Sequence, residues 1–513
     1  MPKTDFADFF ASLAMGDLDA DAVRKALLQR QYFPSVKAVG EELPAILSSE
    51  SFSVDCAKDL ATLPGRAHHA AAWTELRARR FDGLVRRLGI PHPVPYSRLA
   101  LHVGDNWSHL AQLLGSPRSQ IKPRFHKNGR IVQMDYETSE VSLSRDTRLA
   151  QGQEFLVKAD VSNCFPSVYS HAIDWATRGK KNAKADRSQT TWQAKLDLLV
   201  RNCHDGETKG VMIGPAVSNL LAELVLQRVD DSLVAKGHDF LRYVDDYTSY
   251  CSDRSEAERF VVDLQHALSE YRLDLNTRKT RIADLRQGVG DSWIEDVRVH
   301  VPAKVTPLAG ARFLRHAELL AHRYPQYSVL KFAVKTLRGR RESGQVSSVL
   351  IVDELTRLCT FHPHLAPFLA GELDTIKDVI GEADKARIAR VVERQMRDAA
   401  DRAETDVVLW NLHILRRVLG RRVNKSVWEP LLRMDDDLVA LALMIFVPRS
   451  RAATKARVLG WDYLCETDYQ QHWLVRYEMR RVGLLVEADL TQSEKEWMQV
   501  LGRHNVAFSE LKV

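Results

Sequence analysis

Several features of membrane, secreted and zinc-binding proteins are missing from this sequence. No stretch reaches the roughly 18 consecutive apolar residues that a transmembrane helix needs. The six cysteines are scattered, with no Cys-x-x-Cys pair and no pairing of these cysteines with histidines at zinc-site spacing. The first residues lack the apolar core of a signal peptide. These absences predict reduced thiols, no structural zinc, no membrane partner and a cytoplasmic location.

Charge of one sign is also not strongly in excess. There are 73 Lys and Arg residues against 67 Asp and Glu, a formal net charge of +6. This mild basic excess permits nucleic acid as a partner but does not require it. With 45% hydrophobic and 27% charged residues, the composition excludes general disorder. A chain of 513 residues exceeds what one hydrophobic core accommodates, so two or three domains are expected.

Two apolar segments each carry a carboxylate where a strand would end. Phe240–Cys251 has the pattern of strand, tight turn and strand, with Asp245 and Asp246 at the turn. Asp is common in turns, so the pair alone is weak evidence. However, the apolar run starting at Phe155 also leads into an acidic residue, Asp160. Such carboxylates need a cation to neutralise them, and three together suit Mg²⁺. Two Mg²⁺ ions would support phosphoryl transfer.

The four segments around these residues resemble reverse transcriptases. Tyr243-Val-Asp-Asp is similar to the Tyr-x-Asp-Asp box of that family, and Asp160 occupies the place of its first catalytic Asp. The segment 210–223 resembles the Gly-turn-helix that contacts template and incoming nucleotide, which implies nucleotide-binding roles for Gly214 and Ser218. Lys279 lies in a segment resembling the one whose Lys protonates pyrophosphate. The resemblance implies a two-Mg²⁺ polymerase that uses dNTPs.

Further residues gain candidate roles from this resemblance. Phe165 stands where reverse transcriptases carry a bulky residue under the sugar, and its ring would collide with a ribose 2′-OH; ordinary core packing is the alternative. Lys122 and Arg124 belong to a basic cluster around the turn 127–129. In a polymerase this would be the fingers region, so these two residues are candidate triphosphate contacts.

A narrower resemblance comes from the stretch His171–Lys184. It is similar to abortive-infection (Abi) and related defence-associated reverse transcriptases of bacteria, some of which add nucleotides without a template. Like them, this chain has Ile213 where template-copying enzymes usually have Gln. An Ile side chain cannot form the hydrogen bonds of an amide. Members of the group can also prime on their own tyrosine, and sequence does not select among the thirteen tyrosines here.

The predicted fold class is α+β, a right-hand polymerase with fingers and palm, N-terminal helices and a C-terminal all-α domain. The expected domains are an N-terminal helical region (1–90), fingers and palm (91–310) and a helical repeat domain (311–513). The resemblance implies HEAT-like repeats in the last of these, and stacks of this kind favour a homo-oligomer.

Periodicity predicts individual helices. In the first two domains these cover 19–30, 70–88 and 254–271. The arginines of 70–88 (Arg77, Arg79, Arg80, Arg86 and Arg87) would form a face that is either solvated or phosphate-binding. In the tail the predicted helices cover 350–359, 373–383, 386–400, 406–419, 425–434 and 437–446.

The sequence therefore predicts a cytoplasmic DNA polymerase of the reverse transcriptase class that acts in anti-phage defence. Its partners would be dNTPs and a single-stranded DNA product, with RNA as a further candidate. Synthesis would be template-independent and protein-primed, and a conventional RNA-copying enzyme is the alternative. An RNA-dependent RNA polymerase is disfavoured because that class usually carries Gly-Asp-Asp. A catalytically unused scaffold is disfavoured because all three carboxylates and Lys279 are present.

Overall fold

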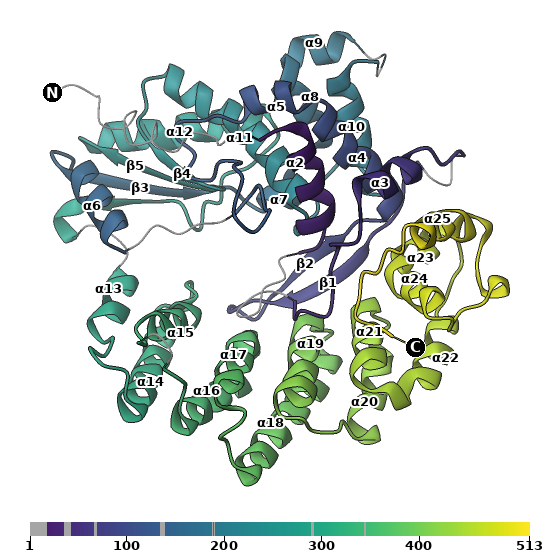
Figure 1. Cartoon of the computed structure of the whole chain (residues 1–513). Helices are drawn as coiled ribbons and strands as arrows, with labels where there is room; N and C mark the ends of the chain where they lie inside the picture. Colours follow the sequence, from purple (N-terminus) through teal and green to yellow (C-terminus); the bar gives the residue numbers. More distant parts are fainter. Residues whose placement is uncertain are drawn as a thin grey trace.

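The computed structural model describes residues 18–34, 43–65, 69–133, 139–186, 188, 190–288, 292–342 and 345–512. A mixed α/β part lies above an arc of helices, and a two-stranded hairpin lies between them (Figure 1). The chain therefore has the mixed α+β character that the sequence predicts. Among the described residues, no helix combines the length and the hydrophobicity needed to cross a membrane.

A four-stranded antiparallel sheet forms the centre of the mixed part. Its strands follow the order β4 (Leu241–Tyr243), β5 (Asp246–Cys251), β3 (Phe155–Asp160) and β6 (Arg281–Asp284). Aromatic and β-branched residues favour strands in these segments. Helix α12 (Arg254–Glu270) packs on β3 and β5, and its start is capped by the side chain of Asp253. The helix predicted over 254–271 is thereby confirmed.

Helices surround this sheet and connect its strands. The longest of them, α11 (Ala216–Ala235), packs against α12 and is mostly buried up to Asp230. The others are α4 (Pro93–Asp105), α5 (Trp107–Leu113), α6 (Ser139–Ala150), α7 (Cys164–Ser167), α8 (Ser170–Arg178), α9 (Lys180–Ala185) and α10 (Trp192–Asn202). The predicted turn at 127–129 is present, since the His126 amide donates to the Arg130 carbonyl at 2.9 Å.

The helix predicted over 70–88 is wrong. The structure has an antiparallel hairpin there, made of β1 (Thr74–Arg79) and β2 (Val85–Ile90). Buried and partly exposed residues alternate along β1, which is the period of a strand. Phe81, Asp82 and Gly83 form the turn, because the Arg80 amide still donates to the Leu84 carbonyl at 2.9 Å, and Gly83 has φ +84°. The helical spacing of the apolar residues was therefore a coincidence over a short window.

The predicted helix near the N-terminus is confirmed. It comprises α2 (Ala20–Lys25) and a π-helical turn, Ala26–Arg30, and its N-cap Asp19 accepts a hydrogen bond from the Ala22 amide at 2.7 Å. A second short helix, α3 (Val54–Ala61), follows and packs against α4.

From Ser292 onward the described chain is helical. Its α-helices are α13 (Ser292–Val299), α14 (Pro307–Arg323), α15 (Val329–Gly339), α16 (Val349–Phe361), α17 (Ala366–Ile376), α18 (Glu382–Asp401), α19 (Thr405–His413), α20 (Lys425–Leu431), α21 (Asp437–Phe446), α22 (Arg451–Leu459), α23 (Glu466–Gln471), α24 (Trp473–Arg481) and α25 (Gln492–Arg503). Neighbouring helices pack on one another along the arc in Figure 1. The helix predicted over 373–383 is wrong, because that range spans the end of α17 and the start of α18. The HEAT-like character and the three domain boundaries stay predictions.

The C-terminal residues of the described chain meet the segment that precedes α3. The Ser48 amide donates to the Phe508 carbonyl at 3.0 Å, and the Glu510 amide donates to the Ile46 carbonyl at 3.1 Å. Phe508 also packs edge-on against Phe52. The last residues therefore return to the N-terminal helices, and the arc of helices is tied to the mixed part at both of its ends.

Candidate active site

Strands β3 and β5 bring the predicted acidic residues together. Their antiparallel register places Asp160 directly opposite Asp246. Asp245 precedes β5 in the turn, and its carbonyl accepts a hydrogen bond from the Val161 amide at 3.1 Å. The three carboxylates predicted from separate segments thus gather at one end of two neighbouring strands.

The turn between β4 and β5 has an unusual backbone. Tyr243 pairs with Asp246, so only Val244 and Asp245 make the turn. Val244 adopts φ +58°, a left-handed conformation that a β-branched residue rarely takes. Such a conformation costs of order 1–3 kcal/mol and persists only where the surroundings enforce it. The carboxylates are therefore presented by a strained turn.

A buried arginine holds this turn in place. Arg242 has no exposed surface, and its Nη1 donates to the Val244 carbonyl at 2.9 Å. Its guanidinium also contacts both carboxylate oxygens of Glu223, at 2.7 and 2.8 Å, and Asp230, at 2.7 Å. Both acids belong to α11. Ser116 donates a further hydrogen bond to Asp230 at 2.7 Å. The turn is thus tied to α11 through one cation.

This positioning role was missed at the sequence level. The signal that could have found it is an arginine inside the otherwise apolar and aromatic run Phe240–Tyr243. A buried charge requires a partner, and the matching acids lie on the helix of the 210–223 motif. Burial raises the pKa of Asp230, and the neighbouring Arg242 opposes that rise.

Lys279 reaches the same point from the segment after α12. Its Nζ lies 2.7 Å from Oδ2 of Asp160. Asn276, which no sequence motif singles out, donates from Nδ2 to the other oxygen, Oδ1, at 2.9 Å. The Asn276 amide also donates to the Asp160 carbonyl at 2.8 Å. This segment is therefore fastened to the end of β3, and Asp160 has partners on both carboxylate oxygens.

The electrostatics of the cluster favour a bound cation. Removal from water and repulsion from Asp160 raise the pKa of Asp245, although Lys279 and Arg86 lower it in part. The same removal from water, together with repulsion from Asp245 and Asp160, raises the pKa of Asp246 to about 7, even though this side chain still reaches solvent. Negative charge thus exceeds what the neighbouring cations neutralise.

This set of carboxylates fits divalent metal ions in its chemistry. Oxygen donors with excess negative charge are the ligands that Mg²⁺ prefers. In the part of the chain that the structure describes, no three acidic, His or Cys side chains are already arranged around a common ion position. Lys279 holds one of the oxygens that an ion would use.

The hairpin β1–β2 places one arginine of the wrongly predicted helix near the carboxylates. Arg86 on β2 is solvent-exposed and lies close enough to Asp245 to lower the pKa of that carboxyl. Of the five arginines proposed for one helical face, Arg77 and Arg79 instead form ion pairs with Asp436 and Glu404. The single phosphate-binding face is therefore wrong, and Arg86 remains as a cation beside the carboxylates.

Two further predicted residues, Phe165 and Lys122, lie near the turn or near α11. Half-buried Phe165 lines a small pocket together with Val244 and Glu223. Lys122 is near enough to Glu223 to feel its charge, and burial lowers the pKa of this lysine. The Arg124 amide pairs with the Ile131 carbonyl at 2.9 Å, next to the basic turn. The nucleotide-contact roles of these residues stay predictions.

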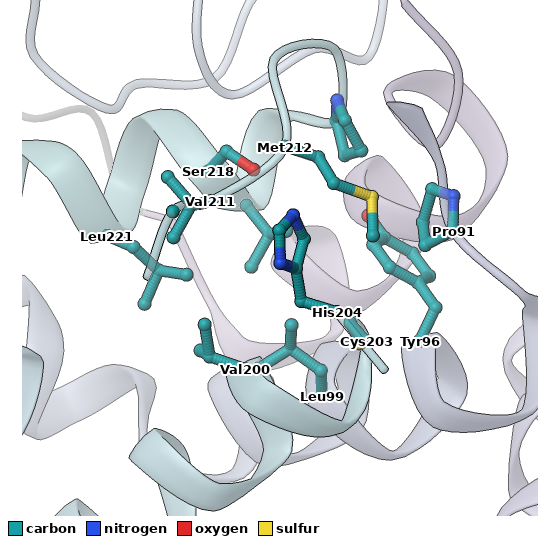
Figure 2. A pocket seen from close by; sticks show the side chains of 13 residues that line it. Pro91, Tyr96, Leu99, Val200, Cys203, His204, Val211, Met212, Ser218 and Leu221 are labelled. Atoms are coloured by element: carbon teal, nitrogen blue, oxygen red, sulfur yellow. The ribbon is translucent and has the colours of Figure 1, made fainter. Parts of the chain in front are cut away.

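Gly214 and Ser218 have packing roles of their own. Gly214 has φ +139°, and a Cβ there would lie 2.9 Å from Cγ of Pro34 and 3.0 Å from the Gly89 carbonyl oxygen. Only glycine fits this contact with the hairpin. Ser218 is buried in a mostly apolar pocket that also contains His204 (Figure 2), and none of the three carboxylates lines it. Their nucleotide-binding roles also stay predictions.

Comparison with known proteins agrees with this geometry. Residues 110–304 match a family model described as "Reverse transcriptase (RNA-dependent DNA polymerase)". That range includes all four motifs from Asp160 to Lys279. A search of curated proteins finds no match. A solved structure, "Structure of apo telomerase from Candida Tropicalis", aligns with 77% of this chain and 69% of that chain, at 10% identity and a TM-score of 0.30. We infer no relationship from a similarity this low.

Proposed function

We propose that this chain, an enzyme of the reverse transcriptase (RNA-directed DNA polymerase) class by its matched domain, extends DNA with dNTPs at Asp160, Asp245 and Asp246. The observation that carries the proposal is the register of β3 and β5, which sets Asp160 opposite Asp246 beside the turn that bears Asp245. Lys279 completes the group. Carboxylates and a lysine in this arrangement suit nucleotidyl transfer.

The three carboxylates would hold two Mg²⁺ ions. Bound there, the ions would neutralise charge on the phosphates and stabilise the attacking and leaving oxygens. In the transfer, a hydroxyl loses its proton to solvent and its oxygen bonds to the α-phosphorus of the dNTP, and the bond from that phosphorus to the oxygen bridging the β-phosphate breaks to release pyrophosphate. Lys279 donates a proton to that leaving group. The phenyl ring of Phe165 excludes a ribose 2′-OH, and Arg86 and Lys122 face the triphosphate.

Template independence is supported by the loop before α11. The side chain of Ile213 is apolar, and its backbone carbonyl is already used by the Gly89 amide at 2.9 Å. The loop therefore lacks the side-chain amide of the copying enzymes. In this proposal the enzyme adds nucleotides without reading a template strand; the alternative is a conventional RNA-copying enzyme.

Protein priming is a further part of the proposal. A priming tyrosine must present its hydroxyl to the active site, so full burial excludes it. Tyr32, Tyr96, Tyr247 and Tyr477 are at most 2% exposed. The hydroxyls of Tyr32 and Tyr96 donate to the carbonyls of Pro91 and Leu27, respectively. The primer is therefore to be sought among the remaining nine of the thirteen tyrosines, and Tyr136 among these lies outside the described residues.

The biological setting is proposed from resemblance. The stretch 171–184 and the helical tail support a bacterial defence enzyme that acts against phage from the cytoplasm as a homo-oligomer. In the structure, the Trp175 ring of this stretch is covered by the ammonium groups of Lys180 and Lys184, at 4.8 and 5.8 Å. The stretch therefore has a packing role whatever its biological one.

One gel tests the proposed function. Wild type and Asp245→Asn are incubated with labelled dNTPs and Mg²⁺ without nucleic acid, and the products are run with and without protease. We expect wild-type product whose mobility changes on proteolysis, and none from the variant. Product only with an RNA template and primer would instead establish a copying enzyme. No product under either condition, with rNTPs also tried, would favour a nucleic-acid-binding scaffold.

A further inference from the structure

Both outer edges of the hairpin β1–β2 are bonded to other parts of the chain. On the β2 side, the Gly89 amide donates to the carbonyl of Ile213, in the loop before α11. On the β1 side, side chains of the C-terminal helices take the place of a strand. The Arg79 amide donates to Oδ1 of Asp406 at 3.0 Å, and the Ala72 amide to Oε1 of Gln470 at 3.1 Å. The hairpin is thus held edge-on between the palm and the helical arc (Figure 1).

Two ion pairs reinforce the β1 side. Nη2 of Arg77 lies 3.0 Å from Oδ2 of Asp436, and Nη1 of Arg79 contacts Oε1 of Glu404. The two carboxylate side chains are 1% and 0% exposed, respectively. Loss of Arg77 would leave Asp436 as a buried charge without a cation, so this contact resists opening, whereas Glu404 keeps a second cation, Arg402, at 2.8 Å. Hydrogen bonds orient Asp436 further, since the Thr405 hydroxyl donates to its Oδ2 at 2.5 Å.

Arg77 and Arg79, which the arc holds, flank the residue of β1 that pairs with Arg86. In the register of the hairpin, Arg86 is directly opposite Ala78, between Arg77 and Arg79. Any shift of β1 relative to the arc would therefore move Arg86 relative to the carboxylates. The tip beyond it exposes Leu84 and Val85 to solvent, at 64% and 39%, so the tip itself gives little anchorage.

We propose that Asp436 and Glu404 are positioning residues for nucleotide addition: by gripping β1 from the helical arc, they fix the hairpin that carries Arg86 opposite Ala78 and that contacts the loop before α11 through Gly89. This inference rests on the proposed function. It gives the C-terminal helices a direct part in dNTP binding at the polymerase site, through the hairpin. No residue of the arc needs to contact the nucleotide for this effect.

The test is a double-mutant cycle in the full-length protein. Asp436→Asn is the first variant, because Asn still caps α21, where Oδ1 of Asp436 accepts from the amides of Leu438 and Val439. Arg86→Gln is the second. We expect each single variant to raise the KM for dNTP roughly five- to tenfold with kcat within about twofold, as expected for lost binding of the substrate. In the double variant the KM should rise no further, because both changes remove one interaction.

A matched control and a rescue complete the design. Asp59→Asn changes another contact between N- and C-terminal parts, the hydrogen bond of Asp59 with Nε2 of His504 at 2.9 Å, which does not touch the hairpin; its KM should equal that of wild type. Arg77→Lys keeps the charge and should stay within about twofold of wild type in KM, as expected for a retained ion pair.

The possible results of this test separate the proposed grip from a purely structural role of Asp436 and from failure of the proposed function. An unchanged KM in Asp436→Asn, or additive effects in the double variant, overturns the grip and leaves Asp436 with a purely structural role. Loss of kcat alone in Asp436→Asn would likewise contradict it. A wild type that incorporates no nucleotide refutes the proposed function itself, and this result is seen before any variant is compared.

Discussion

Nζ of Lys279 lies 2.7 Å from Oδ2 of Asp160, while Asn276 occupies Oδ1 of the same carboxylate. Both oxygens of this central acid are therefore engaged by the chain itself. A metal ion that binds Asp160 through Oδ2 competes with the ammonium group for it. Lys279 is solvent-exposed and flexible enough to leave. Metal binding and release of the lysine are thus linked in this site.

The first prediction concerns that competition. Lys279→Met removes one positive charge from the carboxylate cluster, so Mg²⁺ should bind more tightly, because it no longer displaces a cation. The concentration of Mg²⁺ for half-maximal activity should fall severalfold. If Lys279 also donates the proton to pyrophosphate, kcat should fall about 10²-fold. Nucleotide incorporation measured over a Mg²⁺ titration checks both. Lys279→Arg, which keeps the charge, should leave the Mg²⁺ dependence close to that of wild type; a rise in the Mg²⁺ requirement of Lys279→Met contradicts the idea.

The second prediction concerns pH and stability without metal. The pKa of Asp246 is raised to about 7 in the folded protein, against about 3.9 in the unfolded chain. The folded state therefore holds the proton more tightly, and the free energy of unfolding contributed by this group is lost as pH rises from about 4 through 7. Asp246→Asn has no carboxyl group to titrate, so its free energy of unfolding does not undergo this loss. In EDTA, the melting temperature of the variant relative to wild type should thus increase across this range and level off above it.

Mg²⁺ supplies the control for this pH series. At pH 8, adding Mg²⁺ should raise the melting temperature of wild type more than that of Asp246→Asn, because the ion stabilises the charged carboxylates. Asp274→Asn, in an exposed residue of the neighbouring loop, should follow wild type at every pH. Parallel pH profiles for wild type and Asp246→Asn would contradict the raised pKa. Activity of Asp246→Asn should be lower by about 10²-fold or more, as for loss of one electrostatic stabiliser.

The third prediction concerns the buried cation behind the turn. Arg242→Met leaves Glu223 and Asp230 buried without their partner, so the free energy of unfolding should fall by about 3–5 kcal/mol. Denaturant unfolding measures this change. Arg228→Met is the matched control on α11, because Arg228 pairs with Asp231 near the surface, at 2.7 Å; it should cost under about 1 kcal/mol. Equal effects of the two variants would show that Arg242 is not the tie between turn and helix.

The parts of this structure that sequence could predict are those encoded locally. Asp160 ends an apolar strand, and Asp245 and Asp246 sit at a turn between aromatic runs, so each strand and turn is readable from its own neighbours. Family resemblance then joined them with Lys279 into one site. Most of the helices predicted in the tail were also readable from their own apolar faces and end signals, and 437–446 has the bounds predicted; the exception is 373–383, which spans the end of α17 and the start of α18.

What sequence could not predict depends on contacts between distant residues. Arg77 meets Asp436, which lies 359 residues further along the chain, and no local pattern records that pairing. Without it, the arginines of 70–88 resembled a helix face. The role of Arg242 was missed for the same reason, because it depends on contacts with two acids of α11, Glu223 and Asp230. The strain at Val244 is likewise visible only once the turn is closed by Arg242 and β3.

The last prediction concerns the choice between deoxy- and ribonucleotides. Phe165 lines the pocket beside Val244, next to the turn that carries Asp245. If its ring excludes a 2′-OH, Phe165→Val should raise the efficiency of rNTP use relative to dNTP by about 10²-fold, because a steric clash rather than a hydrogen bond is removed. The ratio of kcat/KM values for the two nucleotides measures this. Phe155→Val, a partly buried residue at the far end of β3, should leave the ratio unchanged. An unaltered ratio in Phe165→Val would make Phe165 an ordinary core residue.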